Sequence, residues 1–159
     1  MKEQEKGEVV QKMEFNGKGA YFVATKVFLR DGDKLLLVHD KWGNWELPGG
    51  RIKPEEFQKP LAEVTSRKMH EELGEDIEYS EPEATGTFFQ VTREELGQQV
   101  RIFALGFEAQ YLRGEIILNG PHDEMKWVDV ETFEPLKLQD NDWMRGVQDY
   151  LDKIRKEKK

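Results

Sequence analysis

The chain has 159 residues, of which 37% are hydrophobic, and its formal net charge is −8 at pH 7. This length allows one buried core and is too short for two ordinary domains. The negative charge disfavours broad contact with nucleic acids or membrane surfaces, because both are polyanions, and a phosphorylated substrate would need a mediating cation. Cysteine is absent, so any metal would bind oxygen or one of three histidines, which favours Mg²⁺ or Mn²⁺.

The N-terminal segment lacks the features of a targeting sequence. Its first twenty residues carry charges every few positions, without the apolar stretch of a signal peptide. No run elsewhere approaches the length needed to cross a bilayer. We therefore expect a cytoplasmic protein, with an N-terminal tail or edge segment over residues 1–17 and a single domain over residues 18–159.

A strand pair is predicted to open the domain. Residues 20–30 and 34–40 are rich in β-branched, aromatic and aliphatic side chains, and Asp31-Gly32-Asp33 between them is typical of a hairpin turn. A tryptophan-rich loop over 42–50 follows. The next segment is predicted to be a helix that has Pro60 in its first turn and ends at Leu73-Gly74, because glycine commonly terminates a helix.

Further strands and a closing helix are predicted for the second half of the chain. The strands are separated by polar or glycine-bearing turns and cover 84–92, 99–112 and 124–130. The helix begins after Asp140 or Asn141, either of which can cap it. Its apolar residues recur at spacings of three and four, which predicts one face docked on the sheet: Trp143, Val147, Tyr150, Leu151 and Ile154.

The end of the first predicted helix presents two acidic residues on one face. Lys68, Glu71 and Glu72 are related as i, i+3 and i+4, so their side chains can converge. One interpretation is a metal site. The other is a solvated ladder of ion pairs, Glu63 with Arg67 and Lys68 with Glu72, each worth a few tenths of a kcal/mol.

The surrounding residues favour the metal-site interpretation, because they resemble the signature of the Nudix hydrolases, the Nudix box. Leu47-Pro48-Gly49-Gly50-Arg51-Ile52 precedes the helix, with Trp45 just before it. Glu124 stands shortly before Trp-Val, where the family often has an acidic residue. The box positions that can be placed are Gly50, Glu56, Arg67, Met69, Glu71, Glu72 and Gly74. The resemblance covers roughly residues 18 to 155.

This resemblance implies an α/β fold, an α/β/α sandwich around a mixed β-sheet. It also implies Mg²⁺-dependent (or Mn²⁺-dependent) attack of water on a diphosphate linkage in a nucleoside diphosphate-type small molecule. The implied metal ligands are the Gly49 carbonyl, Glu71 and Glu72, with Glu71, Glu72 and Glu124 as catalytic residues. Lys68 and Arg51 are expected to contact substrate phosphate. The residues expected to support the site are Gly50, Glu56, Arg67 and Gly74. A homodimer is a further prediction.

The sequence departs from the Nudix box in three places. Ten residues separate Glu56 from Arg67 where the box has seven, and Glu75 replaces an aliphatic residue. Lys68 replaces a glutamate that in many relatives binds metal or acts as general base. An ammonium about 5 Å from a divalent ion costs several kcal/mol, so Lys68 is expected to swing away, pair with Glu72 or bind substrate phosphate. The alternatives to a working enzyme are a weak or inactive nucleotide-binding relative and a protein-interaction module.

Other candidate residues carry weaker signals. The three histidines, His39, His70 and His122, are too scattered in the sequence to predict a metal triad. Four aromatic residues could stack on a nucleobase, although core packing is the commoner role for such positions: Trp42, Trp45, Phe88 and Phe89.

Overall fold

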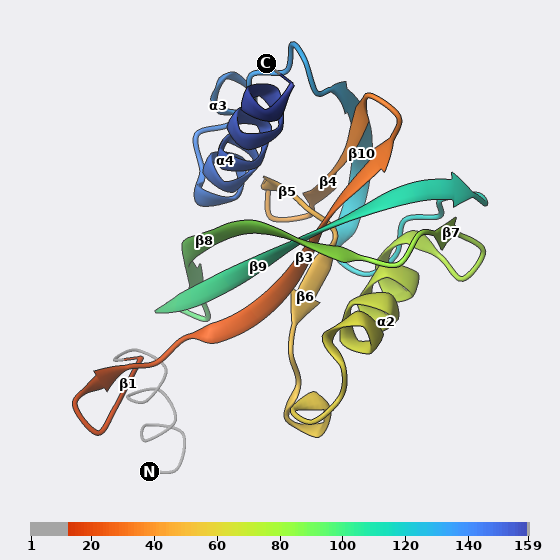
Figure 1. Ribbon diagram of the computed structural model, residues 1–159. Helices are drawn as coiled ribbons and strands as arrows, with labels where there is room; N and C mark the ends of the chain where they lie inside the picture. The colour runs from red at the N-terminus through yellow and green to blue at the C-terminus, as the bar shows by residue number, and fades with distance from the viewer. Residues whose placement is uncertain (1–12, 159) are drawn as a thin grey trace.

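The computed structural model describes residues 13–158 (Figure 1). A short hairpin, β1 (Glu14–Phe15) and β2 (Lys18–Gly19), forms a separate two-stranded sheet at the start of this range. The predicted tail of residues 1–17 therefore includes part of this hairpin, and its first twelve residues lie outside the described part of the chain.

The centre of the fold is a mixed sheet. Its long strands are β3 (Phe22–Asp31), β4 (Lys34–Asp40), β8 (Glu83–Glu95), β9 (Gln98–Arg113) and β10 (His122–Asp129). These match the five predicted strands within three residues at each end. The order is β10-β4-β3-β9, and β3 pairs with β9 in parallel while β4 and β8 pair antiparallel with their neighbours.

Three short strands extend this sheet, and none was predicted. They are β5 (Trp45–Glu46) on β4, β6 (Gly49–Arg51) on β3, and β7 (Glu78–Tyr79) on β9. The first two come from the predicted tryptophan-rich loop. Their pairing carries residues 45–51 across the ends of the central strands and fixes the glycines against β3.

Two main helices follow the predicted pattern. A short 3₁₀ helix, η1 (Pro54–Glu56), precedes α2 (Leu61–Leu73), and Pro60 is the residue that caps α2 rather than part of its first turn. Near the C-terminus, α3 (Pro135–Leu138) leads to α4 (Asp142–Glu157). Of the two predicted caps, Asn141 caps α4, and its side chain accepts a 2.7 Å hydrogen bond from the backbone N–H of Met144.

The helices α2 and α4 cover opposite faces of the sheet (Figure 1). Alternate residues of β4 divide between two cores, because side chains of a strand point to opposite faces in turn. Leu35 and Leu37 pack with Tyr150 of α4, whereas Leu36 and Val38 pack with α2. The fold is thus the predicted α/β/α sandwich. Within residues 13–158, no helix is both long and apolar enough to span a bilayer.

Candidate functional site

A cavity of about 270 Å³ opens where β3, β6 and α2 meet the start of β10. Its walls carry two carboxylates, Glu46 and Glu72, and two indole rings, Trp42 and Trp143. Six cationic side chains also line it: Lys26, Arg51, Lys53, Arg67, Lys68 and Arg93. The cavity therefore gathers cationic side chains in a chain whose net charge is −8. Four of them pair with carboxylates: Lys26 with Glu46, Arg51 and Arg93 with Glu95, and Arg67 with Glu56.

A bidentate ion pair joins the loop before α2 to the helix. Arg67 donates from Nε to Glu56 Oε2 and from Nη2 to Glu56 Oε1, both at 2.6 Å. The hydrogen bonds from Arg67 lower the pKa of Glu56 to about 2. The ten intervening residues, three more than in the Nudix box, do not prevent this contact. Arg67 pairs with Glu56 and Glu71 in place of the Glu63 partner that the ladder interpretation gave it.

The two box carboxylates have different environments. Glu72 is buried, and its Oε2 accepts a 3.2 Å hydrogen bond from the backbone N–H of Gly49. Burial raises the pKa of Glu72, although the charge of Lys26 opposes this. Glu71 is exposed, pairs with Arg67 at 3.2 Å, and is not among the residues that line the cavity. Only Glu72 of this pair therefore lies on the cavity wall.

The two glycines before α2 are constrained in different ways. Gly49 has φ +126°, and a Cβ there would lie less than 3.0 Å from the backbone of Thr25 and Lys26. A Cβ on Gly50 would meet only the flexible stem of Lys68. Gly74, with φ +101°, ends α2 and donates its N–H to the His70 carbonyl at 3.1 Å.

A buried ionic network on the cavity wall was missed by the sequence analysis. Lys26 Nζ donates to Glu46 Oε1 at 2.7 Å, to the Leu47 carbonyl at 3.1 Å and to the Gly49 carbonyl at 3.2 Å. Burial raises the pKa of Glu46, but Lys26 and His122 outweigh it and lower the value to about 2. A lysine within the apolar strand FVATKVFL was the signal that could have predicted this network.

His122 completes the network between the two buried carboxylates. Its Nε2 lies 3.7 Å from Glu46 Oε2 and its Nδ1 lies 3.6 Å from Glu72 Oε2, so neither contact is a normal hydrogen bond. Because the two ring nitrogens face different carboxylates, one ion could not be bound by all three side chains. No local pattern in the sequence indicates that His122 lies at this position.

Lys68 lies beside both box carboxylates. Its Nζ is 3.6 Å from Glu71 Oε2 and 3.8 Å from Glu72 Oε1, and its side chain is about one-quarter exposed. The Lys68–Glu72 pair of the ladder interpretation is therefore present. Both contacts are longer than a hydrogen bond, which leaves the ammonium group able to turn toward a ligand in the cavity.

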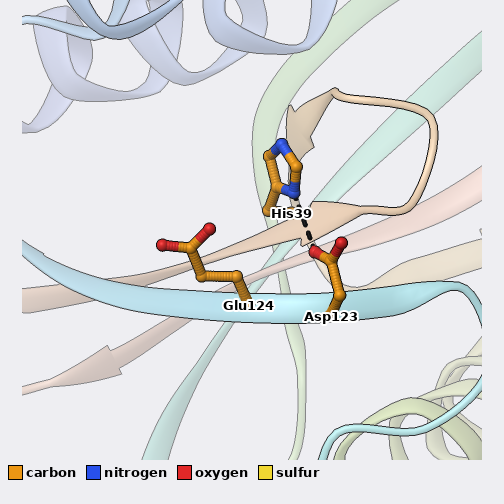
Figure 2. Close-up of side chains that lie close together, drawn as sticks. All are labelled: His39, Asp123 and Glu124. Carbon is orange, nitrogen blue, oxygen red and sulfur yellow. Dashed lines mark hydrogen bonds and ion pairs between the residues drawn. The ribbon is translucent and has the colours of Figure 1, made fainter.

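Glu124 lies outside the cavity lining, in a cluster on the surface (Figure 2). It is exposed on β10 and pairs in register with His39, whose Nδ1 lies 2.8 Å from Asp123 Oδ1. Candidate ligand atoms of these three residues lie within 4.8 Å of one another. Exposed clusters of this kind are common without a metal. The position of Glu124 outside the cavity lining does not support the prediction that it takes part in catalysis. That prediction remains untested.

The aromatic candidates divide between core and cavity. Phe89 is buried against Trp143, and Trp45 packs against the same core, as the commoner role predicts. Trp42 is 62% exposed, lines the cavity, and also lines an outer recess together with Arg93. Phe88 is exposed as well. Of the four candidates named from the sequence, Trp42 is therefore the one that lines the cavity and is exposed to a ligand there.

The oxygen atoms at the Nudix box are of the types that bind a hard divalent ion, but their surroundings in the structure do not suit such an ion. The Gly49 carbonyl, Glu71 and Glu72 are the donor types that Mg²⁺ prefers. In the structure the Gly49 carbonyl accepts from Lys26, and Lys68 lies beside both carboxylates. One ammonium at about 5 Å from a divalent ion costs about 7 kcal/mol at an effective dielectric constant of about 20. As they stand, these residues do not fit a resident divalent ion.

Comparisons with known proteins identify the class to which this fold and site belong. The family model described as NUDIX domain matches residues 20–149. The chain belongs to this family, and the match and the fold support a Nudix-type pyrophosphohydrolase. No protein of curated function is similar enough in sequence to count as a match.

Solved structures share the fold at low sequence identity. A MutT protein from Methanosarcina mazei Go1 is 24% identical, with a TM-score of 0.61 over 87% of this chain and 96% of that chain. An ADP-ribose pyrophosphatase from Streptococcus suis is 18% identical, with a TM-score of 0.56 over 86% of this chain and 93% of that chain. A MutT NUDIX hydrolase from Burkholderia pseudomallei is 22% identical, with a TM-score of 0.54 over 71% and 86% of the two chains.

Proposed function

We propose that the chain hydrolyses the diphosphate linkage of a nucleoside diphosphate-type small molecule bound in the cavity beside α2. The observation that carries this proposal is the set of six cationic side chains lining that cavity in a chain with a net charge of −8. Localised positive charge next to a Nudix box is what a diphosphate requires, because its oxygens must be neutralised before water can attack phosphorus.

The two ends of the substrate contact different parts of the cavity. The phosphates lie between Lys68 and Arg51, which approach from α2 and β6. The nucleoside end extends to Trp42, whose indole is exposed at the junction of the cavity and the outer recess. A nucleobase can stack on such a ring, a contact worth about 1–3 kcal/mol per base. Trp42→Ala should therefore raise KM more than it lowers kcat.

In the reaction, water forms a bond to one phosphorus and the bridging P–O bond breaks, which gives two phosphate-bearing products. Mg²⁺ and Mn²⁺ are tested as activators of this step because the Nudix resemblance implies a divalent ion, although the residues as they stand do not fit one. Glu72 and Glu71 are the carboxylates that would then receive the ion. Metal binding in the absence of substrate is expected to be weak.

The test is a screen of diphosphate compounds with Mg²⁺ and with Mn²⁺, read by release of phosphate-bearing products. ADP-ribose belongs in the panel because a solved structure with this fold is named an ADP-ribose pyrophosphatase. Arg67→Lys serves as a matched variant that keeps the charge but loses the bidentate contact with Glu56. Release of no product from any compound would refute the proposal.

A second function is favoured by one observation, the pair of ammonium groups beside the Nudix box. Lys68 replaces a box glutamate, and Lys26 engages the Gly49 carbonyl. A protein built in this way could bind a nucleotide-like ligand without turning it over. Ligand-induced thermal stabilisation with no product would support such a module, whereas turnover of about 1 per second or more would exclude it. A cytoplasmic location and a homodimer remain predictions, to be tested by cell fractionation and light scattering.

A further inference from the structure

We propose that the ammonium group of Lys26 takes the place of a divalent cation at the Nudix box, so that the cavity binds a diphosphate through fixed cations without needing a metal ion. This inference rests on the proposed function in one respect, that the cavity is where a diphosphate binds. It goes beyond that function because it assigns the charge neutralisation to the side chains of this chain.

The first support is the position of Lys26. The register of β3 against β6 places Lys26 directly opposite Gly49. Its side chain is only 5% exposed, and its Nζ lies 3.2 Å from the Gly49 carbonyl, 3.1 Å from the Leu47 carbonyl and 2.7 Å from Glu46 Oε1. An ammonium group has three N–H donors. All three are therefore used, and the group is held in one place.

The second support is that this position repels a competing cation. A divalent ion on the Gly49 carbonyl would lie about 2.0–2.6 Å from that oxygen. The ammonium of Lys26 already binds the same oxygen, and Trp143 closes its other side with the ring centroid 4.6 Å from Nζ. Lys26 cannot withdraw without leaving Glu46 buried and without its ammonium partner, a costly change. A metal ion on this oxygen would therefore lie beside a fixed positive charge that repels it.

The third support is that a different lysine remains available to the ligand. Lys68 makes only the two long contacts with Glu71 and Glu72, at 3.6 and 3.8 Å, and its stem lies along Gly50 at the cavity wall. Lys26 thus fills the carbonyl position, while Lys68 can turn to a phosphate oxygen. Lysine acts at phosphate sites as such a point charge. Lys26 and Lys68 together supply the positive charge that one divalent ion would otherwise supply.

The experiment measures binding, which needs no turnover. Wild-type protein is titrated with ADP and with inorganic pyrophosphate by calorimetry, once in EDTA and once in Mg²⁺. We expect dissociation constants that agree within about threefold in the two conditions. Mn²⁺ alone, followed by its paramagnetic signal, should bind wild type with a dissociation constant of about 1 mM or weaker.

Variants test the assignment to Lys26. The double variant Lys26→Met/Glu46→Gln removes both buried charges together, which protects the fold, and should bind Mn²⁺ at least tenfold more tightly than wild type. Lys34→Met is the matched control, because Lys34 is an exposed lysine on β4 whose partner Asp129 lies outside the cavity. This control should leave both Mn²⁺ and pyrophosphate binding unchanged.

The outcomes separate this inference from the proposed function. Diphosphate binding that is lost in EDTA, or micromolar Mn²⁺ binding by wild type, would overturn the inference and leave the proposed function standing. No binding of ADP or pyrophosphate in either condition would count against the diphosphate site itself. If the double variant fails to fold, the two wild-type measurements still decide the question.

Discussion

Replacing Lys26 by Met should destabilise the folded protein by about 3–5 kcal/mol at pH 7, because it leaves a buried carboxylate without its partner. Lys26 and Glu46 are 2.7 Å apart, with side chains only 5% and 8% exposed. Methionine fills a similar volume beside Trp143, so the loss comes mainly from charge rather than packing. The Leu47 and Gly49 carbonyls lose a hydrogen-bond donor as well.

The pH dependence gives a second measure of the same contact. The pKa of Glu46 falls from 4.5 to about 2 in the folded protein, a difference that corresponds to about 3 kcal/mol. Because the folded pKa is lowered, this stability is present above pH 4.5 and is lost as the pH falls toward 2. In Lys26→Met the contribution of Lys26 to this lowering is absent, so Glu46 takes up a proton at higher pH. The stability gap between wild type and variant should narrow in acid.

The assay is urea-induced unfolding followed by tryptophan fluorescence at pH 7 and at pH 3.5. The double variant Lys26→Met/Glu46→Gln should recover much of the loss at pH 7, since no buried charge remains. The control Lys34→Met removes an exposed ion pair in which Lys34 Nζ lies 3.5 Å from Asp129 Oδ2. It should lower the free energy of unfolding by less than about 1 kcal/mol. A loss below about 1 kcal/mol for Lys26→Met, with a gap that does not change with pH, would refute the reasoning.

Three further substitutions test the site. Gly49→Ala should lower the melting temperature far more than Gly50→Ala, because its Cβ meets the backbone of Thr25 whereas that of Gly50 meets a flexible lysine stem; equal losses would contradict this. Lys68→Glu should tighten Mn²⁺ binding at least tenfold and weaken pyrophosphate binding in EDTA, both measured by calorimetry. An unchanged affinity for Mn²⁺ would show that the side chain of residue 68 does not face the metal site. Glu124→Gln should change turnover less than about threefold, since Glu124 lies outside the cavity lining; a loss of about a hundredfold, as for a general base, would show that it reaches the substrate.

The elements that the sequence predicted correctly are those with a strong local pattern. The hairpin of β3 and β4 follows from two apolar runs around Asp31-Gly32-Asp33, and its turn has Gly32 at φ +59°. The helix α4 follows from apolar residues at helical spacing. By contrast, β5, β6 and β7 contain two or three residues each. Strands of that length exist only because a longer neighbour pairs with them, which no local periodicity reveals.

The candidate site likewise has parts that follow a local sequence pattern and parts that do not. Glu56 contacts Arg67, and Glu72 is buried beside Gly49, at positions that the Nudix box indicates. The roles of these residues remain predictions. Lys26 and His122 come from strands far from the box in the sequence, and they reach it only through the register of the sheet. No spacing rule links Lys26 to Gly49. The parts of the site that set its charge therefore depend on long-range pairing.

One part of this network could nevertheless have been predicted from physical chemistry. Lys26 stands between Thr25 and Val27 in a strand whose residues 24–29 are all buried. A charged group in such a place requires a buried counter-charge and further hydrogen bonds, because desolvation without compensation is too costly. The sequence thus predicts that some acid must lie inside with Lys26, but several acids are available and only the fold selects Glu46. That selection matters for function, since the same pairing brings the ammonium group to the Gly49 carbonyl. The ammonium group that the fold buries beside Glu46 is, by its position, also the charge that would compete with a metal ion at the Nudix box.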